Sequence, residues 1–153
     1  MDLRLAIPSD AAALTALINR AFAVERFFID ADRIDLAEVR ERFRSGRFLV
    51  LEEGGALAAC VYLELRGPHA YLGLLSVEPA RQGRGIGSRM MDAAEDYCRG
   101  EGCRHLDLRV VNLRQELPPF YRQRGYLETG AAPFPAGHPV TQPCHFIEMS
   151  KGL

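Results

Sequence analysis

The fold of this chain is best indicated by one segment, Val77-Glu-Pro-Ala-Arg-Gln-Gly-Arg-Gly-Ile-Gly-Ser88. An apolar run from Tyr71 to Val77 predicts a strand before it, and the stretch itself carries glycine at three alternate positions. The first turn of a helix has unpaired N–H groups and the positive end of the helix dipole, and glycine lets a ligand approach that backbone closely. A strand, a glycine-rich turn and a helix therefore predict a site for a phosphorylated ligand. The helix is indicated by apolar residues at helical spacing, Ile86, Met90, Ala94, Tyr97 and Cys98.

The composition is that of a single globular domain spanning residues 1–153. The chain is 48% hydrophobic and 25% charged with a net charge of −1, which argues against binding to nucleic acid or to an anionic membrane. No apolar run approaches the length of a membrane span or a signal peptide, so a cytoplasmic location is expected. The four cysteines form no C-x-x-C pair and are expected to be reduced, and no spacing of ligand residues indicates a metal.

The predicted elements follow the order β-α-α-β-β-β-α-β-α-β-β. Short turns at residues 53–55 and 67–68 indicate an antiparallel meander, which then passes through a helix into a parallel crossover. We therefore expect an α/β (α+β) fold with a mixed, mostly antiparallel sheet of about seven strands flanked by about four helices. The strands are expected at residues 3–7, 47–52, 56–65, 70–77, 104–111, 126–129 and 144–149. The first helix is expected to start with Ser9 or Asp10 as its N-cap, and the other three are expected near 35–44, within 80–101 and near 118–124.

Three kinds of phosphate site compete for the glycine stretch. A P-loop requires G-x-x-x-x-G-K-[ST], and no lysine lies near it. A dinucleotide-binding turn requires G-x-G-x-x-G directly after a strand, whereas Ser88 replaces the third glycine and five residues separate Val77 from Gly83. The third kind has the form [RQ]-x-x-G-x-[GA] at the start of a helix, and it is matched by Gln82-Gly-Arg-Gly-Ile-Gly87.

With this third pattern the chain resembles the GNAT superfamily of N-acetyltransferases, in which the loop binds the pyrophosphate of acetyl-coenzyme A. Leu74-Leu-Ser-Val-Glu-Pro79 is similar to the family's fourth strand and its exit. Arg109-Val-Val-Asn112, followed by Phe120-Tyr-Arg-Gln-Arg-Gly-Tyr126, is similar to its second motif. The resemblance covers nearly the whole chain, most specifically residues 74–126, and implies the GNAT acyltransferase fold.

The resemblance also implies a role for each matching residue. The main chain of Leu75 and Val77 would pair with the pantetheine arm, and the Leu75 N–H would point at the thioester oxygen. Tyr121 would be the general acid toward the leaving thiolate, since a phenol with a pKa of about 10 is protonated at neutral pH. The glycines could instead allow close packing of the helix on the strand. Tyr121 could instead anchor a short helix. The implied coenzyme-binding residues are Leu75, Val77, Gln82, Gly83, Arg84, Gly85, Gly87, Ser88 and Asn112.

The motif departs from the family at one place, and the proton acceptor has to be found separately. The segment 113–117 lengthens the spacing between Asn112 and Tyr121. An alkyl amine with a pKa of about 10.4 costs roughly 4–5 kcal/mol to deprotonate at pH 7, and a carboxylate accepts that proton well only where burial raises its pKa. Glu64, late in its strand, is the candidate base, and an exposed strand carboxylate is the alternative interpretation. Other candidates are His69, His138 and His145.

Segments 24–34 and 130–143 would shape the acceptor pocket by the same resemblance. Glu25, Asp30 and Asp32 would either favour a cationic amine or be solvated loop charges. A small amine, an amino acid, an antibiotic and a protein N-terminus all stay open as acceptor, as does a homodimer. The sequence predicts an N-acetyltransferase that moves the acetyl group of acetyl-coenzyme A to a primary amine by direct attack in a ternary complex, without a metal. A non-catalytic acyl-coenzyme A binding or sensing domain and a nucleotide-binding module are the alternatives.

Overall fold

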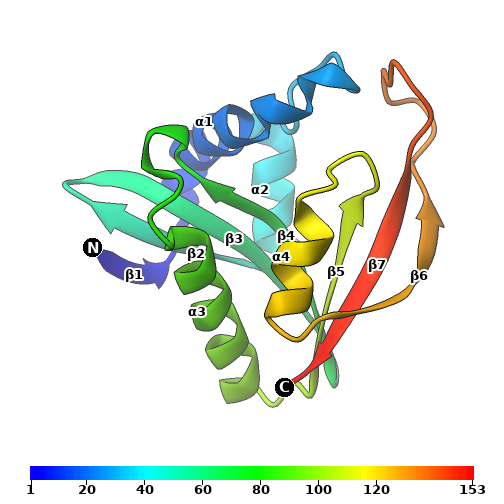
Figure 1. The fold of residues 1–153 in the computed structure, drawn as a ribbon. Coiled ribbons are helices and arrows are strands. Elements are labelled where there is room, and N and C mark those ends of the chain that lie inside the picture. Colours follow the sequence, from blue (N-terminus) through cyan, green and yellow to red (C-terminus); the bar gives the residue numbers. More distant parts are fainter.

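The computed structural model describes residues 1–153 as a seven-stranded mixed sheet with helices on both faces (Figure 1). The strand order is β1-β2-β3-β4-β5-β7-β6, and every neighbouring pair is antiparallel except β4 with β5. The expected fold class is confirmed. The strands are β1 (Asp2–Leu5), β2 (Arg47–Glu53), β3 (Ala56–Arg66), β4 (His69–Val77), β5 (His105–Val111), β6 (Leu127–Pro133) and β7 (His145–Gly152). The helices are α1 (Ala11–Phe22), α2 (Leu36–Ser45), α3 (Ile86–Gly100) and α4 (Leu117–Gln123).

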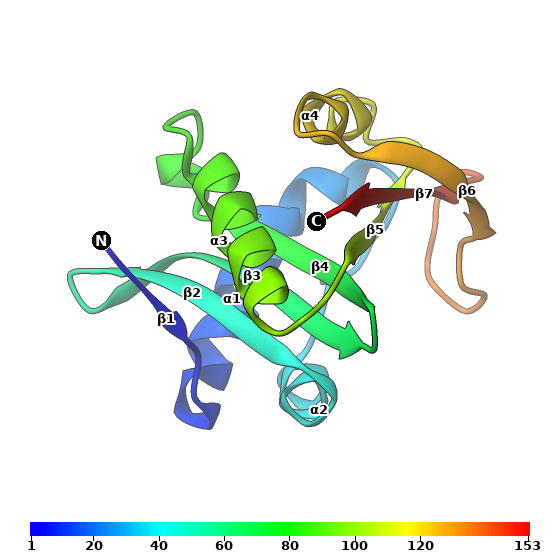
Figure 2. The same cartoon turned by 90° about the horizontal axis from the view of Figure 1, so that it is seen from below.

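The sheet separates two hydrophobic cores (Figure 2). The core beneath α1 and α2 contains Leu14, Leu17 and Ile18 at helical spacing, all fully buried. The core beneath α3 and α4 is larger and includes Met90, Tyr121 and side chains of five strands. Because α3 and α4 lie on the same side of the sheet, the glycine loop before α3 and the tyrosine of α4 are brought to one face.

The two N-terminal helices begin in different ways. The Asp35 side chain caps α2 by accepting a hydrogen bond from the Glu38 N–H at 2.8 Å. A 3₁₀ turn, Pro8–Asp10, precedes α1, and the Asp10 carboxylate does not cap that helix. It accepts instead from the Ile7 N–H at 2.8 Å and from the Arg4 guanidinium. Asp10 is thus the N-cap residue of α1, one of the two expected, but its side chain makes no cap hydrogen bond because Arg4 and the Ile7 N–H already occupy the carboxylate.

A β-bulge interrupts β4, where the sequence suggested a plain strand. The register with β3 shifts between Cys60 and Tyr62, and Leu74 has a φ of +56°, which is unusual for a residue with a side chain. The alternation of faces changes phase there, since Leu72 packs in the α3 core, Leu74 in the α1 core and Leu75 again against the α3 core. The bulge thereby redirects the C-terminal half of β4.

The parallel pairing of β4 with β5 is consequently short. It covers only residues 69–71 of β4 and 105–107 of β5, so the two strands separate over their C-terminal halves. β6 also runs further than expected, to Pro133, and shortens the predicted loop of residues 130–143. A proline is tolerated there because β6 is the edge strand of the sheet.

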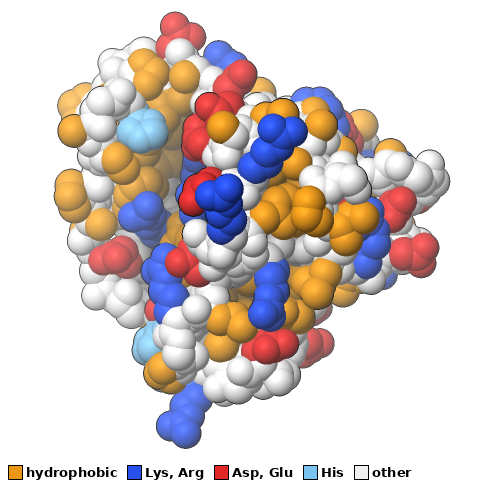
Figure 3. Space-filling model, turned by 180° about the vertical axis from the view of Figure 1, so that it is seen from behind, with side chains coloured by type: hydrophobic (Ala, Val, Ile, Leu, Met, Phe, Trp, Pro, Cys, Tyr) orange, Lys and Arg blue, Asp and Glu red, His pale blue; other side chains and the backbone are white.

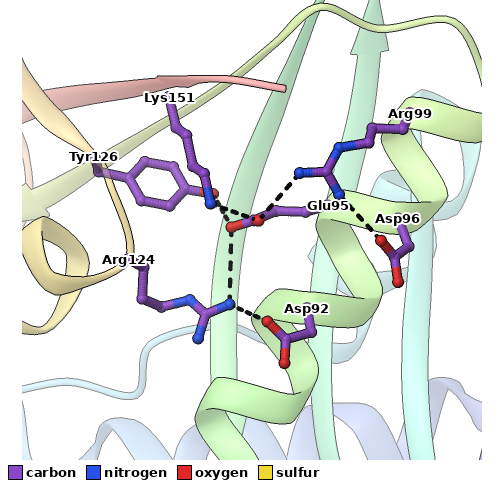
Figure 4. Close-up of polar contacts among 7 residues, drawn as sticks. All are labelled: Asp92, Glu95, Asp96, Arg99, Arg124, Tyr126 and Lys151. Carbon is purple, nitrogen blue, oxygen red and sulfur yellow. Dashed lines mark hydrogen bonds and ion pairs between the residues drawn. The ribbon is translucent and has the colours of Figure 1, made fainter.

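Buried charges join α3 to the C-terminal strands (Figure 4). Glu95 on α3 is 4% exposed, and its carboxylate accepts hydrogen bonds from Lys151 Nζ at 2.8 Å and from the Tyr126 hydroxyl at 3.0 Å. Arg124, just after α4, reaches both Glu95 and Asp92. This network fixes the end of α4 against α3, across the core that contains Tyr121.

No helix of the structure is long and apolar enough to cross a membrane. All four cysteines are free thiols, and three of them are buried. The structure contains no group of three or more His, Cys, Asp or Glu side chains arranged to hold a metal ion.

Candidate active site

A cavity of about 850 Å³ lies where β4 and β5 separate. Residues 71–75 of β4 and 108–111 of β5 form two of its walls, and the glycine loop lies at one end. The space-filling view from the α1–α2 side shows the surface hollowed between those helices and the β6–β7 lobe (Figure 3). The bulge in β4 therefore creates the space for a ligand.

The two segments expected to shape an acceptor pocket meet across the other end of this cavity. Ile29 and Val140 form an isolated antiparallel bridge, and the Thr141 N–H donates to the Phe28 carbonyl at 2.8 Å. Both segments contribute to the wall, the first through Glu25 and Arg33 and the second through Phe134 and His138. The bridge makes a roof over this end of the cavity, which we call the chamber.

The glycine loop presents unpaired backbone donors to the cavity. None of the six consecutive N–H groups from Gly83 to Ser88 donates a hydrogen bond within the chain, and no side chain caps α3. Gly83 and Gly85 have φ values of +79° and +76°, and a Cβ at either position would enter open space. Donors at the positive end of a helix dipole, beside space that a side chain would fill, fit a pyrophosphate.

The edge of β4 that faces the cavity has no partner strand beyond Tyr71. Leu75 and Val77 lie on this stretch and line the cavity. The Gln82 side chain donates to the Val77 carbonyl at 3.3 Å and holds the loop against the strand end. An unpaired strand edge can hydrogen-bond an extended chain containing amides, such as a pantetheine arm.

Tyr121 reaches the cavity from α4. Its ring packs edge-on against Phe120 and Tyr126, with centroids 5.0 and 5.8 Å away, and the residue is 5% exposed. Burial raises the pKa of Tyr121 to about 12, so the phenol is protonated at neutral pH. The hydroxyl forms no hydrogen bond within the chain, and it is not fully buried. It is therefore open to the cavity that Tyr121 lines.

Three of the predicted site residues do not line the cavity. Arg84 is exposed and is not part of the cavity lining. The Asn112 side chain accepts a hydrogen bond from the His145 N–H at 2.8 Å and fastens the end of β5 to β7. Glu64 accepts from the Tyr62 hydroxyl at 2.8 Å and from Arg66 at 3.3 Å. Burial alone would raise the pKa of Glu64, but these hydrogen bonds together with the charges of Arg66 and Arg42 outweigh it and leave the pKa lowered.

The other predicted residues come together although they lie far apart in the chain. They line one cavity from the glycine loop to α4: Leu75, Val77, Gln82, Gly83, Gly85, Gly87, Ser88 and Tyr121. Among the histidine candidates only His138 lines it. His69 is held by Asp107 at 2.7 Å and stacks on His105 outside the cavity, and His145 pairs through its backbone with Asn112.

Glu25 has the environment that a base in this chamber requires. It is 9% exposed, lines the cavity and accepts a hydrogen bond from Arg114 at 2.9 Å. Burial raises the pKa of Glu25, with Arg114 acting in the opposite direction. The sequence placed Glu25 only among three loop acids, because its burial depends on a partner 89 residues away. The one local signal was the unusual segment 113–117, which carries Arg114.

Comparison with known proteins identifies a family. The profile of the Acetyltransferase (GNAT) family matches residues 12–126. An uncharacterized N-acetyltransferase of Bacillus subtilis (strain 168), YhfO, is 29% identical over 138 residues, which cover 84% of this chain and 91% of that protein. The chain therefore belongs to the GNAT acetyltransferase family, whose members use acetyl-coenzyme A.

Solved structures of low sequence identity share the fold. The ribosomal-protein-S18-alanine N-acetyltransferase from Escherichia coli superposes with a TM-score of 0.83 at 18% identity, covering 99% of this chain and 92% of the other. YncA, described as a putative acetyltransferase from Salmonella typhimurium and solved with acetyl-coenzyme A, gives a TM-score of 0.75 at 23% identity, covering 100% and 94%. The fold of this chain is thus one that holds acetyl-coenzyme A in at least one relative.

Proposed function

We propose that this protein transfers the acetyl group of acetyl-coenzyme A to a primary amine by direct attack in a ternary complex. One observation carries the proposal, namely that Gly83 and residues 85–88, whose N–H groups are free, line the same cavity as the free hydroxyl of Tyr121. The first can hold the pyrophosphate, and the second can reach the reacting end. The unpaired edge of β4 between them fits the connecting pantetheine arm.

The cavity supplies a donor and an acceptor for the two protons of the reaction. The amine nitrogen attacks the thioester carbon, the carbon–sulfur bond breaks, and Tyr121 gives its proton to the departing sulfur. Glu25 takes the proton that the amine loses, directly or through water. Its carboxylate suits this role better than that of Glu64, because Glu25 lines the cavity and has a raised pKa. The backbone N–H of Leu75 stabilises the oxyanion as it develops.

The experiment that tests this function is a thiol-release assay over a panel of amines, after acetyl-coenzyme A binding has been measured by calorimetry. Binding with amine-dependent release of free thiol supports the transferase. Binding without thiol release for any amine supports the alternative, a non-catalytic acyl-coenzyme A sensor. Tighter binding of ATP or NAD than of acetyl-coenzyme A contradicts both and leaves a nucleotide-binding module.

A further inference from the structure

Three arginines in the cavity wall have no carboxylate partner. Most arginines of the chain form an ion pair, as Arg114 does with Glu25, but Arg33, Arg42 and Arg109 have no carboxylate oxygen within 4.0 Å. Arg33 and Arg42 are also partly buried. A buried cation without a counter-ion is costly, so the absence of a partner within the chain calls for one from outside it.

Aromatic rings hold these arginines in place. Arg33 lies over the ring of Phe22 at 5.4 Å, and Arg42 lies over the ring of Tyr62 at 5.0 Å. A guanidinium over a ring keeps N–H donors along its edge for other partners, and Arg42 also lies close enough to the Tyr62 hydroxyl to act on its pKa. The donors are therefore positioned in advance for a planar anion, which a guanidinium binds through two parallel hydrogen bonds.

Several acids lie near these arginines without forming an ion pair with them: Glu25 and Glu38 act on Arg33, and Glu64 lies within the field of Arg42. Burial lowers the pKa of Arg33, and the charge of Arg42 adds to that effect, while Glu25 opposes it. Glu25 is itself bonded to Arg114, so it cannot fully serve Arg33. The chamber thus holds two neighbouring cations, Arg33 and Arg42, and no acid of the chain is bonded to either of them.

The arginines stand where the main cavity meets a second hollow of about 470 Å³. Both spaces are lined by Arg33, Arg42, Tyr71, Leu108 and Arg109. Figure 3 shows basic side chains along the hollowed face. A ligand that extends from the reacting end towards the second hollow must pass these guanidinium groups.

We propose that the acceptor is a small amine that carries a carboxylate, and that Arg33 and Arg42 bind this carboxylate while the amine lies towards Glu25 and Tyr121. The inference rests on the proposed acetyl transfer and names its substrate class. The cavity of about 850 Å³ behind the bridge between Ile29 and Val140 has room for a free small molecule. Complementary charges at both ends match a zwitterion.

The test compares each amino acid with its own carboxamide in the thiol-release assay. The series includes α-, β- and γ-amino acids, so that the distance between amine and carboxylate is varied. At least one acid is expected to exceed its carboxamide by tenfold or more in kcat/KM. The carboxamide leaves the amine less basic and hence more often neutral, so a preference for the acid cannot come from amine reactivity.

Variants assign the preference to residues. Arg33→Gln and Arg42→Gln are each expected to raise KM for the preferred acid at least tenfold, while KM for its carboxamide and the affinity for acetyl-coenzyme A stay unchanged. Arg33→Lys should restore part of the loss, because it keeps the charge but not the fork of donors. Arg40→Gln is the matched control, since Arg40 lies on the same helix as Arg42 and is exposed, unpaired and outside the cavity.

The outcomes separate this inference from the function on which it rests. Thiol release that is equal for acids and carboxamides, or faster for peptide N-termini than for any free acid, overturns the substrate class and leaves the transferase standing. If acetyl-coenzyme A binds but none of the amines causes thiol release, both the substrate class and the proposed transfer are overturned. The comparison of acid and carboxamide uses the unaltered protein, so it decides the question even if a variant fails to fold.

Discussion

Tyr121 combines burial with an available hydroxyl, and both properties come from its surroundings. The aromatic packing that raises its pKa to about 12 leaves the hydroxyl no partner but what enters the cavity. A phenol in this state keeps its proton at neutral pH, so the proton is available when a departing thiolate develops beside it. Its chemistry is thus set at the scale of one residue and its nearest neighbours.

Tyr121→Phe should lower kcat about a hundredfold or more, because the leaving sulfur loses its proton donor. The dissociation constant for acetyl-coenzyme A should not change, since the ring is kept. In the unaltered protein, loss of the Tyr121 proton should not reduce the rate below about pH 11, because the group must be protonated and its pKa is raised. Steady-state thiol release and calorimetry measure both quantities. Tyr97→Phe, the same change outside the cavity, is the control, and an unaltered kcat in the Tyr121 variant would remove the role.

Glu25→Gln should lower kcat/KM and abolish the acidic limb of its pH profile. The base works when deprotonated, so activity falls as the pH drops through the raised pKa of Glu25, at a higher pH than for an ordinary carboxyl. Glu64→Gln is the matched control and should leave both rate and profile unchanged. Thermal unfolding of each variant shows whether loss of the Arg114 pair has affected the fold. A response in the Glu64 variant alone would support the sequence-based candidate instead.

The glycine loop and α3 act together as one element, because the free donors exist only where the loop turns into the helix. Gly85→Asp should abolish measurable binding of acetyl-coenzyme A, since it adds a carboxylate beside the N–H groups meant for a phosphate. Gly54→Asp is the control, as Gly54 also has a positive φ, of +59°, and open space around it, but lies in the β2–β3 turn. Calorimetry should show normal affinity in the control. Retained binding in the Gly85 variant would place the pyrophosphate elsewhere.

Elements were predictable where one local signal defines them. The strand, glycine turn and helix of residues 71–100 follow from periodicity, and Asp35 caps α2 as an aspartate before an amphipathic run should. The bulge at Leu74 was not predictable, because a straight apolar strand and a bulged one have the same composition. Its cause lies in the pairing of β4 with β3, which no window of sequence contains.

At the scale of the whole molecule, the Glu95 network holds the C-terminal strands and α4 against α3 (Figure 4). Glu95→Gln should lower the free energy of unfolding by about 3 kcal/mol, because Lys151 and Arg124 lose the buried anion between them. Asp96→Asn, one residue along on the exposed side of α3, should cost less than about 1 kcal/mol. Urea unfolding measures both changes. Equal stability of the two variants would show that the network contributes nothing.

The cavity belongs to this largest scale, since its walls come from segments along the whole chain. The loop and Tyr121 were found in the sequence by their motif, as their roles depend on local backbone or on one aromatic side chain. Glu25 and Arg33 were not, because what distinguishes them is burial and the presence or absence of a partner. Glu64 shows the opposite error, since the sequence suggested it as the base. In the structure its carboxylate already accepts hydrogen bonds from Tyr62 and Arg66.

The order of elements, the mixed sheet, the GNAT resemblance and the loop suited to a pyrophosphate could all be inferred from the residues alone, because periodicity and glycine placement act over short distances. The separation of β4 from β5, the meeting of the Ile29 and Val140 segments, and the lack of an ion pair for Arg33 and Arg42 could be seen only in the folded chain. Pairing, burial and desolvation depend on groups that are distant in the chain. For this reason the acetyl donor could be inferred from the sequence, whereas the class of amine acceptor could be inferred only from the arrangement of residues in the folded structure.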